Sequence, residues 1–292
     1  MTEGFGAFNE YGALRRVALR HARDAFGSEA AIAASWRALN YTAPPDLATA
    51  VAEFDAFATC LGDAGAEIAW LPGGDGLGLD AVYVRDGAIV TPRGLVLGNM
   101  GKAARVAEPE AAGRALAKLG VPIAGAISCD GRLEGGDVVW FDDRTCAVGQ
   151  GYRTNAEGIR QLRDLLGPAV EVIVVPLPHY RGPDDVFHLM SIISPLDADL
   201  ALVHSPLMPV PFREWLLDRG LSLVEVAEGE FDSMAGNVLA LAPRRCLMLE
   251  GNPATRARLE ATGCAVTTYA GAEISAKGSG GPTCLTRPLA RG

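Results

Sequence analysis

Several side chains capable of nucleophilic, acid–base or ion-pairing chemistry stand at the ends of short apolar runs. Carboxylates flank one such run in LDAVYVRD and precede another in LEGGDVVWF, a histidine opens HLMSIIS, and an asparagine opens NVLALA. A cysteine lies among glycines in KGSGGPTC. The residues are Asp80, Asp86, Glu134, Asp137, His188, Asn237 and Cys284. If these runs are equivalent elements arranged around one axis, the side chains meet in a single pocket.

A pocket that combines a thiol, an imidazole and carboxylates suits a planar guanidinium group. Carboxylates accept paired N–H bonds from a guanidinium, whose central carbon is a poor electrophile that needs a strong nucleophile such as a thiolate. We therefore expect Cys284 to attack that carbon and His188 to protonate the departing amine. Water then hydrolyses the covalent intermediate. The substrate cation can itself lower the pKa of the thiol. Asn237 is expected to orient backbone.

The elements that must position these residues repeat along the chain. Four stretches read as strand, turn, strand, helix, strand, and their first strands are predicted at 81–84, 137–141, 188–194 and 237–242. Equivalent positions in the four stretches are separated by 56, 53 and 47 residues. A less regular module has strands at 15–21 and 66–72 around a helix at 44–65. A period near 50 residues favours radial or linear repetition, and closure around an axis would make 1–292 one α/β domain.

Composition excludes several classes of protein. The chain has 292 residues, 35 of them glycine, and its 49% hydrophobic content excludes wholesale disorder. A net charge of −9 argues against nucleic acid as a partner. The six cysteines form no CxxC pair, so no zinc knuckle is indicated, and we expect all but Cys284 to be core residues. No signal peptide or membrane-spanning run is apparent, so we expect a cytoplasmic protein with no membrane partner.

The motifs LDAVYVRD, LEGGDVVWF, YRTNAEG, FHLMS and GGPTC resemble, in type and order, those of the guanidino-group-modifying superfamily. This superfamily includes arginine deiminases, amidinotransferases and dimethylargininases (dimethylarginine dimethylaminohydrolases), and dimethylargininases are the closest in motif. The resemblance covers roughly residues 80 to 287. It implies a pseudo-fivefold α/β propeller of ββαβ modules, of the pentein type, which agrees with the repeat.

The resemblance also implies a role for each matching residue. Cys284 resembles the nucleophile, His188 the general acid and base, and Glu134 the carboxylate that pairs with the guanidinium beside the histidine. Asp86 resembles the aspartate that binds the guanidinium, and Asp80 an outer substrate contact. The remaining expected substrate contacts are Arg105 and Arg153, which resemble binders of a substrate carboxylate, and Asp137, whose alternative role is to orient backbone or the histidine.

Two departures bear on the substrate. Deiminases and amidinotransferases usually have an acid two residues after the histidine, whereas this chain has Met190. Dimethylargininases also lack that acid, and an apolar side chain suits N-methyl groups. Arg85, in contrast, is more typical of deiminases. Met190 should lie nearer the reacting nitrogen, so we expect an Nω-methylated L-arginine that yields citrulline and a methylamine.

Other interpretations stay open. An arginine deiminase is the first alternative and an amidinotransferase the second. The same scaffold also serves a ribosome-binding factor, so a binding module is a third, although it would need no convergent thiol, imidazole and carboxylates. His179, His188 and His204 lack metal-site spacing, and GGDGLG lacks the dinucleotide-binding register.

We therefore expect neither a metal nor a cofactor, and a small guanidino molecule as the partner. The sequence is compatible with a homodimer but does not fix the oligomeric state. Residues 21–45 are rich in small residues and could form a lid over the pocket.

Overall fold

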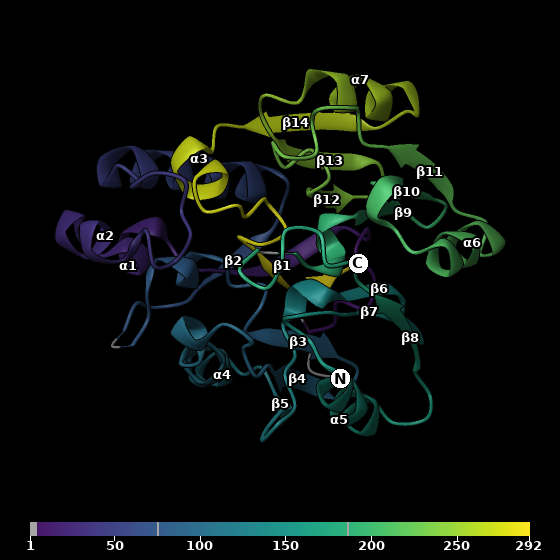
Figure 1. The fold of residues 1–292 in the computed structure, drawn as a ribbon, viewed down its shortest axis with the longest axis horizontal. Helices are drawn as coiled ribbons and strands as arrows, with labels where there is room; N and C mark the ends of the chain where they lie inside the picture. Colours follow the sequence, from purple (N-terminus) through teal and green to yellow (C-terminus); the bar gives the residue numbers. More distant parts are fainter. Residues whose placement is uncertain (1–4, 75, 186) are drawn as a thin grey trace.

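Five three-stranded sheets surround a central axis, and the helices lie outside them (Figure 1). The computed structural model describes residues 5–74, 76–185 and 187–292. In sheet order the strands are β15 (Arg287–Arg291), β1 (Leu14–Leu19) and β2 (Glu67–Trp70); β3 (Ala88–Thr91), β4 (Gly94–Leu97) and β5 (Ile123–Ala126); β6 (Val138–Asp142), β7 (Thr145–Gln150) and β8 (Glu171–Pro176); β9 (Ile193–Asp197), β10 (Leu200–Val203) and β11 (Ser222–Glu225); and β12 (Val238–Ala242), β13 (Arg245–Leu249) and β14 (Ala265–Tyr269).

The helices begin where the sequence supplies capping side chains. Asp46 accepts a hydrogen bond from the Thr49 N–H at the start of α3, and Asn155 accepts one from the Gly158 N–H at the start of α5. Gly167 ends α5 with a φ of 78°, which favours glycine. The helices are α1 (Ala22–Phe26), α2 (Glu29–Ser35), α3 (Leu47–Asp63), α4 (Glu108–Lys118), α5 (Ala156–Leu166), α6 (Val210–Asp218) and α7 (Pro253–Ala261).

The four sheets that begin with β3, β6, β9 and β12 have the predicted module topology. In each, the first two strands pair antiparallel, a helix follows, and the third strand pairs parallel with the middle one. In β7, for example, Val148 pairs with Val138 of β6 on one side and Val174 of β8 on the other. The ββαβ repeat and the α/β propeller expected from the sequence are therefore confirmed.

The least regular module is completed by the far end of the chain. β15 pairs antiparallel with β1, and β1 pairs parallel with β2. Arg287 of β15 lies opposite Ala18, and Pro288 lies opposite Val17. The missing first strand of this module is therefore β15, which the sequence analysis did not identify.

The strand predicted at 81–84 is wrong, and the strand predicted at 188–194 is wrong at its beginning. Leu79–Val82 and Leu189–Ser191 form short 3₁₀ turns, and the strands begin later, at Ala88 and Ile193. Short apolar runs that are buried on all sides do not distinguish a strand from a helical turn by periodicity. The polar residues therefore lie in the turns and loops that precede the first strands rather than on the strands themselves.

Of the five cysteines that we expected in the core, three are buried, one is half-buried and one is exposed. Cys146, Cys246 and Cys264 are buried as predicted, and Cys60 is half-buried. Cys129 is exposed and has a φ of 53°, so its assignment to the core is wrong. It lies in the loop after β5, where the chain turns toward the next module.

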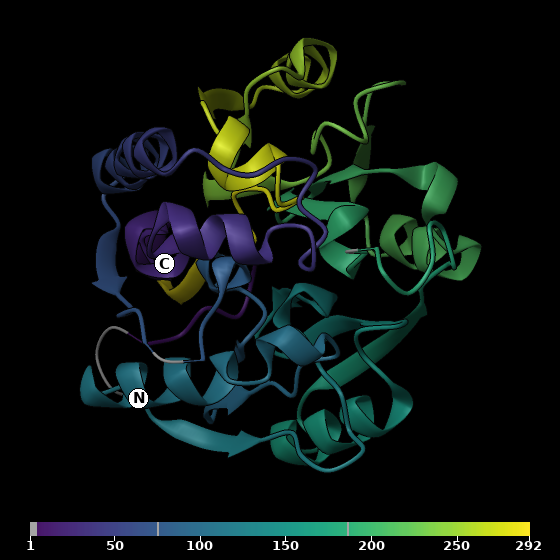
Figure 2. The same ribbon diagram turned by 60° about the vertical axis from the view of Figure 1, so that its left-hand side comes forward.

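The segment proposed as a lid, residues 21–45, contains α1, α2 and a following turn. The Thr42 N–H donates to the carbonyl of Lys277, and the Lys102 ammonium donates to the carbonyl of Leu39. Figure 2 shows this purple segment beside the yellow C-terminal part of the chain. Its opening and closing stay a prediction. In the described chain, no helix combines the length and apolarity that crossing a membrane requires.

The pairing of β15 with β1 makes a stability prediction. Leu289 of β15 is fully buried among residues of the neighbouring sheets. Leu289→Ala should lower the free energy of unfolding in urea by about 2–5 kcal/mol, because it leaves a cavity that the ring cannot collapse to fill. Ile123→Ala on the edge strand β5, where the side chain is 42% exposed, is the control and should cost under about 1 kcal/mol. Equal losses in the two variants would contradict this account of ring closure.

Candidate active site

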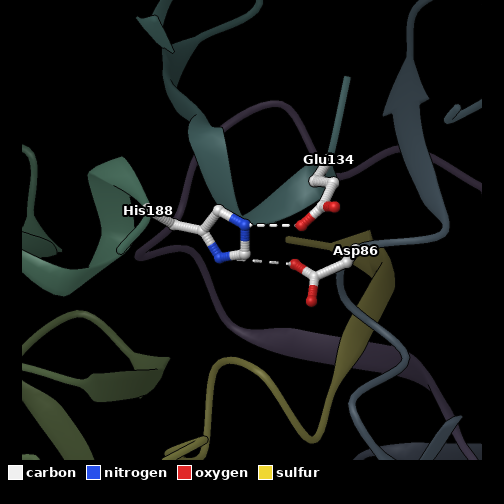
Figure 3. A group of neighbouring side chains, drawn as sticks. All are labelled: Asp86, Glu134 and His188. Carbon is white, nitrogen blue, oxygen red and sulfur yellow. Dashed lines mark hydrogen bonds and ion pairs between the residues drawn. The ribbon is translucent and has the colours of Figure 1, made fainter. Parts of the chain in front are cut away.

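His188 lies between two carboxylates that come from different modules (Figure 3). Its Nε2 is 2.8 Å from Oε2 of Glu134, and its Nδ1 is 3.8 Å from Oδ1 of Asp86. All three side chains are buried. The loops before β3, β6 and β9 supply them, so equivalent positions of three modules converge as the repeat predicted.

These neighbours favour the protonated form of His188. Burial alone would lower the pKa of the imidazole, because it disfavours the charged form. The carboxylates of Asp86, Asp137 and Glu134 outweigh burial and raise the pKa of His188 to about 9. At neutral pH the imidazole is therefore a cation with a proton to donate. Burial would raise the pKa of Glu134, but hydrogen bonding to His188 and the charges of His188 and Arg153 lower it.

Glu134 is held from both of its oxygens. Oε1 accepts a hydrogen bond from the Gly101 N–H at 2.8 Å. Oε2 accepts one from Nη1 of Arg153 at 3.3 Å and also contacts His188. The side chain is fully buried and lines neither of the two cavities described below. In this structure Glu134 therefore contacts the histidine and Arg153. Its contact with the substrate stays a prediction.

Asp86 and Arg105 form a buried ion pair. Nη1 of Arg105 is 2.6 Å from Oδ2 of Asp86, and its Nε and Nη2 bind the carboxylate of Glu108. Nη2 also donates to the carbonyls of Asp80 and Tyr83. A substrate carboxylate would have to compete with these partners for Arg105. Arg105 is thus less available for its predicted role than Arg153, whose guanidinium binds only Glu134 among the residues that the structure describes.

Asp80 lies at the wall of the same region and pairs with Lys102. The distance between Nζ of Lys102 and Oδ2 of Asp80 is 2.6 Å, and both side chains are largely buried. Lys102 was not singled out in the sequence, although it stands three residues before Arg105 in the same segment. The pair adds one basic and one acidic group to this wall.

Asp137 lies behind the histidine. Its Oδ1 accepts the backbone N–H of Leu189 at 2.9 Å, directly after His188, and burial raises the pKa of Asp137 to about 6. It lines neither cavity. Of the two roles considered for Asp137, orientation of the histidine's backbone is the one that this contact supports.

Gly136 is required at the point where His188 approaches Asp86. A Cβ at this position would lie 2.6 Å from Nδ1 of His188 and 2.8 Å from Oδ1 of Asp86. The Gly136 N–H instead donates to that carboxylate oxygen at 3.0 Å. The glycines of LEGGD therefore allow the backbone to come between the two side chains.

Cys284 is partly exposed and is contacted by groups that fix its sulfur. Nδ2 of Asn237 lies 3.4 Å from Sγ, and Oδ1 of Asn237 accepts both the N–H and the hydroxyl of Thr283. Asn237 orients backbone, as expected, but it also touches the thiol, which the sequence analysis did not anticipate. Burial and the charge of Asp86 raise the pKa of the Cys284 thiol. In the free enzyme the sulfur is therefore protonated at neutral pH.

Cys284 and His188 lie at the junction of two cavities. The smaller has about 350 Å³ of empty space and is lined by charged groups that include Asp80, Asp86, Lys102, Arg105 and Arg153. The larger has about 750 Å³, open solvent included, and its wall combines aromatic rings and methionines with charged side chains, which are Arg85, Arg181, Asp185 and Asp232. Both cavities contain His188, Ser279 and Cys284 in their walls. Met190 is buried and lines the larger one.

The charges around the smaller cavity favour a bound cation. Five carboxylates and four basic groups lie around it, so this set carries one formal negative charge when His188 is protonated, not counting Arg287 and the Arg85–Glu10 pair beside it. The carboxylates are Asp80, Asp86, Glu108, Glu134 and Asp137, and the basic groups are Lys102, Arg105, Arg153 and His188. A guanidinium would balance this network and lower the pKa of the nearby thiol.

Asp86, Glu134 and His188 could also serve as metal ligands by type and spacing. Each offers one ligand atom, and these atoms all lie within 4.8 Å of one another. A metal ion bound there would displace the proton of His188 and compete with Arg105 for Asp86 and with Arg153 for Glu134. The expectation of a metal-free reaction stays a prediction that a chelator can test.

The fold and this convergence of groups define an α/β propeller of the class that modifies guanidino groups. A family model described as N,N dimethylarginine dimethylhydrolase, eukaryotic, matches residues 28–291. The chain belongs to this family. The resemblance stated from the sequence motifs is thereby confirmed.

Two groups of curated relatives are similar to the chain. The N(G),N(G)-dimethylarginine dimethylaminohydrolase of Streptomyces coelicolor is 31% identical over 198 residues, which cover 68% of this chain and 72% of the relative. The arginine deiminase of Rhodococcus erythropolis is 29% identical over 192 residues, which cover 54% of this chain and 46% of the relative. The match therefore spans about half the length of the arginine deiminases.

Solved structures confirm the fold. A dimethylarginine dimethylaminohydrolase from Pseudomonas aeruginosa, a cysteine-to-serine mutant complexed with citrulline, has a TM-score of 0.75 at 23% identity and covers 94% of this chain and 98% of its own. The amidinotransferase SxtG from Microseira wollei has a TM-score of 0.81 at 16% identity. The match covers 99% of this chain and 97% of SxtG. Both share the propeller of ββαβ modules.

The raised pKa of His188 makes a prediction about stability and pH. The folded state should retain this proton up to about pH 9, whereas an unfolded histidine releases it near its ordinary value of 6.5. Between these values the folded state binds more protons, so the free energy of unfolding falls as the pH rises. Urea unfolding from pH 7 to 10 should show a steeper fall for the wild type than for His188→Gln. Parallel curves would mean that the buried imidazole is neutral.

Proposed function

We propose that the protein hydrolyses an Nω-methylated L-arginine to citrulline and a methylamine by covalent catalysis at Cys284. The observation that supports this best is the position of Cys284 and His188 at the junction of a charged and an apolar cavity. The charged cavity has the groups that an amino acid and a guanidinium need. The apolar wall at Met190 offers a surface for the methyl groups.

Binding places the substrate's charges on opposite charges of the chain. The guanidinium pairs with Asp86, whose Oδ1 otherwise accepts only the Gly136 N–H among hydrogen bonds of the described residues. Arg153 receives the substrate carboxylate, and Asp80 the amino group. The bound cation offsets the influence of Asp86 on the thiol, so Cys284 releases its proton to solvent when the substrate is present. The nucleophile is thus formed in response to its own substrate.

The reaction then follows from the positions of Cys284 and His188. The thiolate attacks the guanidino carbon and forms a C–S bond, giving a tetrahedral intermediate. His188 donates its proton to the methylated nitrogen, the C–N bond breaks, and methylamine leaves. The imidazole, now neutral, takes a proton from water, which adds to the carbon and releases the sulfur. The products are citrulline, the amine and free Cys284.

An arginine deiminase is the alternative that a specific observation favours, because curated arginine deiminases match this chain at about 30% identity. It would use the same thiol and histidine and release ammonia. Arg85, the residue that resembles deiminases, is buried and pairs with Glu10 at 3.2 Å, and it also lines the larger cavity. Met190 provides no acceptor for an unsubstituted nitrogen, so we place the methylated substrate first.

Replacement of the nucleophile tests the mechanism. Cys284→Ser should lower citrulline formation from dimethylarginine at least ~10³-fold, because the hydroxyl replaces the thiolate. It should leave the thermal midpoint nearly unchanged. Exposed Cys129→Ser is the matched control and should retain full activity. The substrate panel comprises arginine, monomethylarginine, asymmetric dimethylarginine and agmatine, each with and without EDTA.

The outcomes of this panel separate the candidates. Product mainly from the methylated arginines, insensitive to EDTA, would support the proposal. Product mainly from arginine would favour the deiminase, and loss of activity with EDTA would contradict the metal-free mechanism. Normal turnover by Cys284→Ser would overturn covalent catalysis. Mass spectrometry should find an amidino adduct on Cys284 in the wild type during turnover and none in the variant.

Met190 should govern the preference for methylated nitrogen. Met190→Asp would place a carboxylate next to a nitrogen that has lost its N–H donors, at a cost of about 1–3 kcal/mol. The ratio of kcat/KM for dimethylarginine to that for arginine should therefore fall at least tenfold. Met190→Leu keeps an apolar side chain of similar volume and should keep the ratio. An unchanged ratio in Met190→Asp would remove Met190 from the determinants of specificity.

A further inference from the structure

The larger cavity is much bigger than methyl groups require. It has about 750 Å³ of empty space, open solvent included, compared with about 350 Å³ for the charged cavity that suits the amino-acid part of the substrate. It begins at Cys284 and His188 and continues past Met190 to residues of two loops. These loops follow β8 and β11, and of their residues only His188 also lines the charged cavity.

Aromatic rings and methionines form most of the cavity's apolar wall. The rings of Tyr180 and Phe187 have centroids 5.6 Å apart, and those of Tyr180 and Phe231 are 6.1 Å apart. Met190 and Met234 complete this wall. Methionine side chains are flexible and polarizable, so they adapt to apolar groups of different shape. Such a lining favours an apolar occupant over a hydrated one.

Arg181 and Asp232, one from each loop, form an ion pair at the exposed rim, where Asp185 also lines the cavity. Arg181 binds both carboxylate oxygens of Asp232 at 2.8 Å, and its guanidinium lies 5.0 Å from the centre of the Tyr180 ring. The Tyr180 hydroxyl also donates to Asp232. Arg181 and Asp232 are more than half exposed, which places them at the solvent side. These contacts join the loops and leave Arg181 already paired, so the cavity presents no free strong charge from this ion pair.

The position of the cavity identifies the part of the substrate that it would hold. The guanidino carbon must lie at Cys284, and its link to the amino acid must extend into the charged cavity. The departing nitrogen is then the substituent nearest His188 and the larger cavity, since His188 and Cys284 line both. The methyl groups of dimethylarginine would reach only the first part of this space, next to Met190.

We propose that the departing nitrogen of the preferred substrate carries a bulky apolar substituent, an alkyl chain of several carbons or an aromatic ring, which the larger cavity binds. This inference rests on the proposed function and refines its substrate class. The C–N bond broken is the same, the proton again comes from His188, and the product amine is an alkylamine or arylalkylamine in place of methylamine. Each additional methylene that the substrate buries against Phe187 and Phe231 should then raise kcat/KM.

The test compares L-arginines that carry methyl, propyl or benzyl on one ω-nitrogen. Citrulline formation should give a kcat/KM for the propyl and benzyl substrates at least tenfold above that for the methyl substrate, which corresponds to about 1.4 kcal/mol. Phe231→Ala removes part of the apolar wall and should lower the benzyl-to-methyl ratio at least fivefold. Phe8→Ala is the matched control, because Phe8 is also half-buried but packs against Trp140 outside the cavity. It should keep the wild-type ratio.

Each outcome distinguishes this inference from the proposed function. Turnover of the methyl substrate with little or none of the larger ones would overturn the inference and leave the proposed function standing. A benzyl-to-methyl ratio above ten that Phe231→Ala does not change would contradict binding in this cavity. No citrulline from any substrate, with wild-type protein that is folded by circular dichroism, would overturn the proposed function and this inference together.

Discussion

A protonated imidazole buried away from water is stable in this molecule only because carboxylates surround it. Removing charges from water costs several kcal/mol per ion unless partners compensate. Asp86, Asp137 and Glu134 provide that compensation for His188, and Arg105 and Arg153 in turn hold two of these carboxylates. The groups come from loops of three successive modules, so the charge balance requires these modules to be assembled together. The site is therefore a property of the propeller rather than of any one module.

The same balance connects binding with chemistry. Burial and Asp86 keep the Cys284 thiol protonated, and a cation that pairs with Asp86 removes the second of these effects. A neutral molecule of similar shape would not do so. The division into a charged and an apolar cavity assigns recognition of the amino acid to one side of the thiol and of the departing amine to the other. Cys284 and His188, the two reacting groups, line both cavities together with Ser279.

The repeat made the fold and much of the site predictable from sequence. Apolar runs, turn residues and a period near 50 residues identify the modules, and matched polar positions bring Asp86, Glu134 and His188 together, as the structure shows. The 3₁₀ turn at Leu79–Val82 was mistaken for a strand because a short buried run has no decisive periodicity. The engagement of Arg105 by Glu108 depends on side-chain geometry that sequence spacing does not determine. The aromatic wall was missed because Tyr180 and Phe231 lie on loops with no repeating pattern.

Pairing of β15 with β1 also has a consequence for synthesis of the chain. Until β15 emerges from the ribosome, β1 has an unpaired edge, and exposed strand edges are templates for association with other chains. The segment that carries Cys284 directly precedes β15, so the nucleophile enters the site in the same late step that covers this edge. A nascent chain in which the four sheets from β3 to β14 have formed is thus partly folded but still lacks its nucleophile. Vectorial synthesis delays reactivity until the ring is closed.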